Sequence, residues 1–209
     1  GINLTQEKLP RENIFVVGNT IVEPAKKIIK EVTKHRHREV HKTFYDQHII
    51  LDIHRPENFK YKERLENILT YTNDCKNKYN VPVYMLGFKR TMDHIKKFDL
   101  DVGNLEIVDL MSYKNYITNL VKSVFLISDS GTAQDEPALA GTPVVVPRDY
   151  TERPQSIKAG CSFMLDINSV FNSTWRESLS WVTEAKPNPS WLGEGETSDN
   201  MIHALKQIL

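Results

Sequence analysis

The sequence has few cysteines, no long apolar run and no excess of charge of one sign. Cys75 and Cys161 are its only cysteines, and neither belongs to a CxxC pair. A disulfide framework is therefore not expected, and neither is a metal site; a reducing, cytoplasmic environment is predicted. No apolar run reaches the roughly 18 residues that a membrane span needs, so we expect no membrane partner and no signal peptide.

The balance of charge disfavours a nucleic-acid partner. The chain of 209 residues has 27 Lys and Arg against 27 Asp and Glu, which gives a formal net charge of zero. Nucleic-acid-binding domains usually carry a clear basic excess. The one basic cluster, at residues 34–38, is interpreted as a solvated helix end rather than as an anion site.

Short apolar runs alternate with longer amphipathic stretches along the chain. The runs predict strands at residues 14–17, 48–53, 83–86, 105–108, 124–127, 144–146 and 162–165. The amphipathic stretches predict helices at residues 21–33, 61–78, 91–98, 113–121, 133–140, 170–184 and 198–209. Repeated strand–helix–strand units indicate an α/β protein with a doubly wound, Rossmann-like parallel sheet. No internal repeat or low-complexity linker interrupts this pattern, so residues 1–209 are predicted to form one domain.

The densest polar clusters of the sequence directly follow three predicted strands. They occupy residues 54–59, 129–136 and 148–154. Ligands of doubly wound sheets bind in the crevice beyond the carboxyl ends of the strands. The three clusters therefore predict one shared binding site at that edge.

The second cluster begins with a small turn, Ser130-Gly131-Thr132, placed before a predicted helix. Free N–H groups at a helix start bind phosphate oxygens, and the two hydroxyls could add hydrogen bonds. The alternative is that Asp129 or Ser130 only caps the helix. Glu136 follows four residues after Thr132, where it could accept hydrogen bonds from a ribose diol or only complement the helix dipole.

The other two clusters each contribute a basic side chain. His54 could bind a phosphate or transfer a proton, and the alternative is a structural loop histidine. Arg153 could reach anionic oxygens, and the alternative is a surface ion pair with Glu152 or Asp149. The remaining histidines show no metal-ligand spacing, so no metal site is expected.

An ordered set of motifs across almost the whole chain resembles the non-hydrolysing UDP-N-acetylglucosamine 2-epimerase family. The matching segments are Ile14-Phe15-Val16-Val17-Gly18-Asn19-Thr20, His54-Arg55-x-Glu57-Asn58-Phe59, Asp129-Ser130-Gly131-x-x-Gln134-x-Glu136, Pro143-Val144-Val145-Val146, Arg148-Asp149-x-Thr151-Glu152-Arg153-Pro154 and Gly193-Glu194-Gly195. Members of this family have two Rossmann-like domains facing each other across a cleft, the GT-B arrangement. The resemblance implies that this chain is the second, carboxyl-terminal domain, and that the amino-terminal partner domain is absent from it.

The resemblance also implies roles for individual residues in holding UDP or a UDP-N-acetylhexosamine. Ser130, Gly131 and Thr132 would hold the diphosphate and Glu136 the ribose hydroxyls. The remaining substrate-binding positions are His54 and Arg153 at the phosphates, Glu57 in the same motif as His54, Tyr116 against the uracil, and Met111 bordering the base.

The family interconverts UDP-N-acetylglucosamine and UDP-N-acetylmannosamine, a precursor step for cell-surface polysaccharides. It eliminates UDP to give a 2-acetamidoglucal and adds it back with inversion at C2, without a cofactor. The main acids and bases are carboxylates of the first domain. His54 would have an auxiliary catalytic role here, by offsetting charge on the departing UDP. The isolated chain is expected to be inactive, and family members are typically homodimers.

Three departures from the family pattern qualify these expectations. Thr132 stands where a second glycine is usual, Asp135 replaces a glutamate, and the loop at Gly87 lacks the histidine that takes part in binding a regulatory second UDP-sugar. Allosteric regulation of that kind is therefore not expected. Two alternatives stay open: a nucleotide-sugar-binding module without catalysis, and a fragment of a GT-B glycosyltransferase.

Overall fold

The computed structural model describes residues 2–34 and 47–208. The basic cluster at residues 34–38 therefore lies, apart from Lys34, outside the described residues, as does Leu209 at the end of the last predicted helix. The described chain contains six strands in the sheet order β3-β2-β1-β4-β5-β6, and every neighbouring pair is parallel. The strands are β1 His48–Asp52, β2 Val83–Leu86, β3 Glu106–Val108, β4 Ser123–Ser128, β5 Val144–Val146 and β6 Ser162–Met164.

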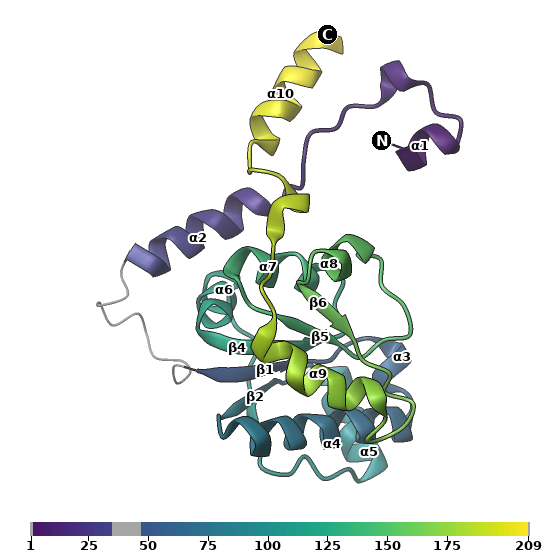
Figure 1. Cartoon of the computed structure of the whole chain (residues 1–209), viewed down its shortest axis with the longest axis vertical. Coiled ribbons are helices and arrows are strands. Elements are labelled where there is room, and N and C mark those ends of the chain that lie inside the picture. Colours follow the sequence, from purple (N-terminus) through teal and green to yellow (C-terminus); the bar gives the residue numbers. More distant parts are fainter. Residues whose placement is uncertain (1, 35–46, 209) are drawn as a thin grey trace.

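Helices cover both faces of this sheet (Figure 1). The α-helices are α1 Ile2–Gln6, α2 Val22–Lys34, α3 Pro56–Phe59, α4 Lys62–Tyr79, α5 Lys89–Phe98, α6 Tyr113–Lys122, α7 Glu136–Ala140, α8 Pro154–Lys158, α9 Ser173–Glu184 and α10 Thr197–Ile208. Short 3₁₀ turns occupy Arg11–Asn13 (η1), Thr132–Gln134 (η2) and Pro189–Leu192 (η3). The predicted doubly wound α/β fold is confirmed.

The central strand explains why both faces need cover. All five residues of β1 are buried, and its three apolar side chains alternate between two apolar clusters. Ile49 and Leu51 join the cluster beneath α4, α5 and α9, whereas Ile50 joins the cluster beneath α2 and α6. Alternate side chains of a strand point to opposite faces, so a strand covered on both faces has consecutive apolar residues, as Ile49, Ile50 and Leu51 do here.

The strand order reverses direction between β1 and β4. β3 and β2 lie on one side of β1, and β4, β5 and β6 follow on the other. The loops after β1 and β4 therefore begin next to each other at the carboxyl edge of the sheet, and the chain continues from them to opposite sides of the sheet. This switch point is where doubly wound sheets bind their ligands.

Two local predictions were wrong, and both have a physical cause. Residues 14–17 form no strand within the described chain: Val16 is 80% exposed, and no strand of the sheet adjoins the segment. The helix predicted at residues 133–140 is divided into η2 and α7. Pro137 lies in the first turn of α7 and has no N–H to donate to the preceding turn, which explains the break.

The two ends of the described chain project together from the body of the molecule (Figure 1). The start of α10 is fixed by Glu23, whose carboxylate accepts hydrogen bonds from the backbone N–H (2.7 Å) and the hydroxyl (2.5 Å) of Ser198. These bonds lower the pKa of Glu23. Among the described helices, none combines the length and apolarity needed to cross a membrane.

Candidate functional site

Asp129, at the end of β4, organises the loop that follows β1. Its Oδ1 accepts a hydrogen bond from the backbone N–H of His54 (3.0 Å). Its Oδ2 accepts from the backbone N–H of Arg55 (3.0 Å) and from the side-chain amide of Asn58 (2.9 Å). The carboxylate is fully buried, and burial raises its pKa although these donors oppose the shift. Asp129 thus joins the two loops of the switch point and does not cap the helix that follows it, as one alternative held.

His54 leaves β1 beside a second buried carboxylate, that of Asp52. The Nδ1 atom of His54 lies 2.8 Å from Oδ1 of Asp52 and 3.6 Å from Oδ1 of Asp129. The hydrogen bond to Asp52 raises the pKa of His54, and partial burial opposes this effect. His54 keeps 31% of its side chain exposed at the ligand edge, so the ring can meet a ligand.

The Ser130-Gly131-Thr132 turn lies against the loop after β1. The backbone N–H of Ser130 donates to Oγ of Ser128 (3.1 Å), and the hydroxyls of Ser130 and Thr132 are 3.3 Å apart. A Cβ atom placed on Gly131 would lie 3.6 Å from the Arg55 guanidinium and from the Glu152 carboxylate. All three polar loops therefore meet at Gly131. The turn opens a three-residue 3₁₀ helix rather than the longer helix expected, so its dipole is smaller.

Glu136 opens α7 and is only 5% exposed. Burial raises its pKa to about 7; the Tyr113 hydroxyl, which bonds to the carboxylate, lowers it, and Asp135 and Asp52 raise it further. Tyr113 was not predicted as a site residue. The available signal was its position three residues before Tyr116 on one helix, since residues at that spacing share a face.

Tyr116 and Met111, the two residues expected to border the uracil, pack against one apolar cluster, and Tyr116 lies near Glu136. Tyr116 is half-buried, and burial raises its pKa well above the usual value, with Asp52 and Glu136 adding to the shift. Met111 packs against the same apolar cluster as Tyr116, and its sulfur accepts a hydrogen bond from Asn119 (3.2 Å). The structure thus brings Met111, Tyr116 and Glu136 to one side of the switch point.

Arg153 pairs with a residue that the sequence interpretation did not consider. Its Nε lies 3.1 Å from Oδ2 of Asp135, which is 2% exposed. The partner is therefore neither Glu152 nor Asp149, the two carboxylates named in the alternative of a surface ion pair. The loop around Arg153 is held by Thr151, whose Oγ1 accepts from the Arg153 N–H (2.9 Å) and donates to Gln134 (2.8 Å). These bonds connect the loop after β5 to the turn after β4.

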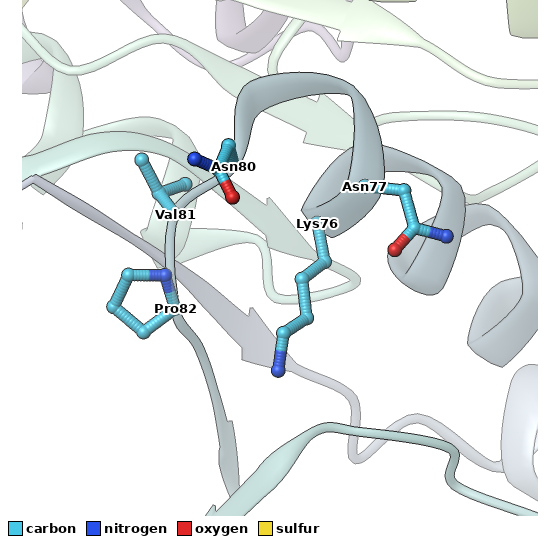
Figure 2. A pocket seen from close by; sticks show the side chains of 5 residues that line it. All are labelled: Lys76, Asn77, Asn80, Val81 and Pro82. Atoms are coloured by element: carbon cyan, nitrogen blue, oxygen red, sulfur yellow. The ribbon is translucent and has the colours of Figure 1, made fainter.

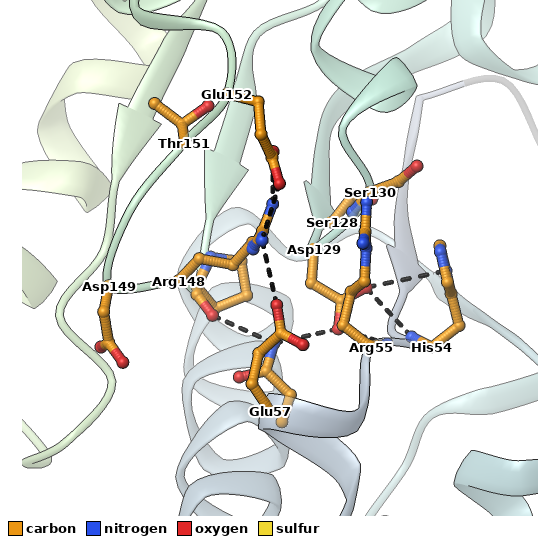
Figure 3. Close-up of polar contacts among 12 residues, drawn as sticks. His54, Arg55, Glu57, Ser128, Asp129, Ser130, Arg148, Asp149, Thr151 and Glu152 are labelled. Carbon is orange, nitrogen blue, oxygen red and sulfur yellow. Dashed lines mark hydrogen bonds and ion pairs between the residues drawn. The ribbon is translucent and has the colours of Figure 1, made fainter.

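Arg148 is a second arginine of this loop that sequence reasoning missed. Its side chain is 1% exposed and forms ion pairs with Glu57 (3.0 Å) and Glu152 (2.8 Å), as Figure 3 shows. The bond from Arg148 lowers the pKa of Glu152 to about 2. The guanidinium also lies 4.6 Å from the centre of the Tyr150 ring. Arg148 thus fixes the loop after β5 against α3, which carries Glu57.

The described residues contain one group with metal-like spacing, formed by Asp52, His54 and Asp129, whose ligand atoms all lie within 4.8 Å of one another. Hydrogen bonds account for this grouping. The oxygens of Asp129 accept from three N–H groups, and Asp52 accepts from the hydroxyl of Ser128 (3.2 Å). The arrangement is that of a hydrogen-bonded network.

A separate polar hollow lies between the end of α4 and the start of β2 (Figure 2). Its lining residues are Lys76, Asn77, Asn80, Val81 and Pro82. They precede β2, at the amino edge of the sheet, so the hollow lies at the opposite edge from the three loops. It brings none of the predicted site residues together.

The fold and this edge define an open α/β domain of the kind that forms half of a GT-B protein. A family model described as UDP-N-acetylglucosamine 2-epimerase matches residues 2–206. The chain belongs to this family.

Curated relatives and solved structures agree with this assignment. The UDP-N-acetylglucosamine 2-epimerase of Methanocaldococcus jannaschii is 26% identical over 97% of this chain and 57% of its own length. That of Salmonella borreze is 30% identical over 96% of this chain and 56% of its own length. The crystal structure of the M. jannaschii enzyme in complex with UDP-GlcNAc and UDP matches 99% of this chain and 58% of that chain, with a TM-score of 0.83 and 25% identity.

This chain therefore spans a little over half the length of the relatives it matches, and it corresponds to their carboxyl-terminal part. A glycosyltransferase of avilamycin A biosynthesis also matches 83% of the chain, with a TM-score of 0.51 and 10% identity. That likeness shows the fold alone. The choice of the epimerase interpretation over the glycosyltransferase alternative rests on the family model.

Proposed function

We propose that this chain is a single UDP-binding domain, the carboxyl-terminal half of a UDP-N-acetylglucosamine 2-epimerase. The observation that carries the proposal is the meeting of three polar loops at the switch point, with Gly131 close to both Arg55 and Glu152. Membership of the epimerase family supports the choice of UDP as ligand.

Within this proposal the diphosphate binds between Ser130–Thr132 and the basic side chains of His54 and Arg153. Arg153 exchanges part of its interaction with Asp135 for the phosphate oxygens. Glu136 accepts hydrogen bonds from the ribose hydroxyls, and Tyr116 and Met111 border the uracil. A buried carboxylate that accepts a ligand's hydroxyl donors is stabilised by them, which gives the buried Glu136 a function.

The full enzyme would eliminate UDP from the sugar and add it back to interconvert UDP-GlcNAc and UDP-ManNAc. The residues of this chain would hold the leaving group, with His54 offsetting the charge that develops on the diphosphate. The acids and bases acting at C2 would belong to an amino-terminal domain that faces this edge. The 209 residues alone are expected to bind UDP and not to epimerise UDP-GlcNAc, which NMR of the sugar anomeric protons can follow.

Calorimetric titration of the 209-residue chain with UDP tests the proposal. Wild-type protein should bind UDP, and Arg153→Ala should bind about tenfold to a hundredfold more weakly, because one charge-assisted hydrogen bond contributes about 1.5–3 kcal/mol. Lys158→Ala, an exposed lysine of α8, serves as the charge-matched control and should bind like wild type. Equal affinities of Arg153→Ala and wild type would remove Arg153 from the site, and no binding by wild type would contradict the proposal as a whole.

Two finer predictions belong with this function. A homodimer is expected from the family and is tested by sedimentation of the chain with and without its amino-terminal partner domain.

A cytoplasmic location fits the free, buried thiols of Cys75 and Cys161, and cell fractionation tests it.

A further inference from the structure

Asp52 is a buried carboxylate at the ligand edge to which neither the motifs nor the proposed function gives a role. It ends β1, and its side chain is 7% exposed. Both of its oxygens have partners. Oδ1 lies 2.8 Å from Nδ1 of His54, and Oδ2 accepts a hydrogen bond from the hydroxyl of Ser128 (3.2 Å).

This geometry restricts the imidazole of His54. Because the acceptor at Nδ1 is a carboxylate, Nδ1 carries a proton in either charge state of the ring. The ring also packs against Phe88, with the centres 4.8 Å apart, so it is supported on a face as well as at Nδ1. Nε2 is on the far side of the ring from Nδ1, and therefore points away from the two carboxylates.

We propose that Asp52 is a positioning residue for nucleotide binding, which holds His54 through Nδ1 so that Nε2 faces the phosphate oxygens of bound UDP. The inference rests on the proposed function, since it concerns the ligand of the same site. Asp52 does not touch the nucleotide itself, because its oxygens are occupied by His54 and Ser128. It acts by fixing the ring and by favouring the imidazolium, whose Nε2–H donates to an anion.

The other charged groups around the ring modify this effect without reversing it. Asp129 supports the imidazolium from the end of β4, and Arg55 opposes it from the same loop. Phe88, which faces the ring from the segment before α5, carries no charge. Among these neighbours Asp52 has the largest effect on the pKa of His54, which is raised. The protonated ring is therefore present at low pH and lost as pH rises through the raised pKa, and UDP affinity falls with it.

The first test needs no ligand. Ring ¹⁵N and Cε1–H shifts of His54 in the wild-type chain should titrate above the ordinary value of about 6.5, with Nδ1 protonated in the neutral ring. In Asp52→Asn the midpoint should fall by about one pH unit or more, since the negative charge is gone and the neutral amide oxygen accepts a weaker hydrogen bond from Nδ1. Asp93→Asn, at an exposed carboxylate of α5, is the matched control and should leave the midpoint unchanged. A wild-type ring protonated at Nε2 in its neutral form, or an unchanged midpoint in Asp52→Asn, overturns the proposal.

The second test is the pH profile of UDP binding by calorimetry. Wild-type affinity should fall as pH rises through the His54 midpoint, and Asp52→Asn should bind about tenfold more weakly at pH 7 with the fall displaced to lower pH. In a His54→Gln background Asp52→Asn should have no further effect. A loss that is equal at every pH and persists in that background would show a structural role only and overturn the proposal. Failure of wild type to bind UDP at any pH would instead overturn the proposed function, while the ligand-free titration still decides whether Asp52 controls His54.

Discussion

Glu136 is a carboxylate whose burial has a measurable consequence for stability. It is 5% exposed, and its pKa is raised to about 7 from an ordinary value of 4.5, chiefly by burial. The folded protein therefore holds a proton there that the unfolded chain has released between these two values. The contribution of this group to stability is fully present below pH 4.5 and is lost as pH rises through about 7.

Glu136→Gln should remove this dependence, because the amide stays neutral at every pH. Between pH 5 and pH 8 the wild-type free energy of unfolding should fall, relative to that of the variant, by on the order of 3 kcal/mol. Urea denaturation at both pH values measures the difference. Parallel pH profiles for the two proteins would show that Glu136 does not titrate in this range.

Several residue-level features could be predicted from the sequence and others could not. His54, Ser130, Glu136 and Arg153 stood out because they follow strands, and strand ends are visible in an apolar pattern. Their partners were not visible. Asp135, which pairs with Arg153, and Arg148, which joins Glu57 to Glu152, are linked through the tertiary fold rather than through spacing.

The loop after β1 shows how one residue determines the shape of an element. α3 has no side-chain cap of its own, and Asp129 from the end of β4 accepts the N–H groups of His54 and Arg55 just before it. Unpaired buried N–H groups are costly, so this remote carboxylate fixes the chain where it enters α3.

Asp129→Asn should destabilise the protein by about 2 kcal/mol or more, because an amide N–H₂ would face N–H donors that now have an acceptor. Urea denaturation measures the change. Asp93→Asn, which removes an exposed carboxylate paired with Lys89 at 2.9 Å, should change stability by less than about 1 kcal/mol. Equal stability of the two variants would contradict the role given to Asp129.

The sequence predicts helices and strands where the cause is local, and it fails where the cause is a contact made in the folded chain. Strands β1, β2 and β5, in which every residue is buried, were predictable because burial on both faces requires a largely apolar run. The segment 14–17 has the same composition but no neighbouring strand in the described chain, and composition alone cannot supply a partner. The break before α7 could have been predicted from Pro137, a purely local signal.

At the scale of the whole molecule, one edge of the sheet carries the site and one end carries two projecting segments. α10 has exposed apolar side chains, including Leu205 (56%) and Ile208 (63%). The relatives are longer than this chain, which covers 57% of the M. jannaschii enzyme. In the proposed enzyme this domain would bind UDP, and the amino-terminal domain would supply the acids and bases that act on the sugar.

The most direct test of this account is a map of amide chemical-shift changes as UDP is added to the ¹⁵N-labelled chain. The account predicts that the largest changes lie at the switch point, in residues 54–58, 130–136 and 151–153, and that they saturate together. Changes centred on the hollow at Lys76–Pro82, or changes scattered over the surface without saturation, would contradict it.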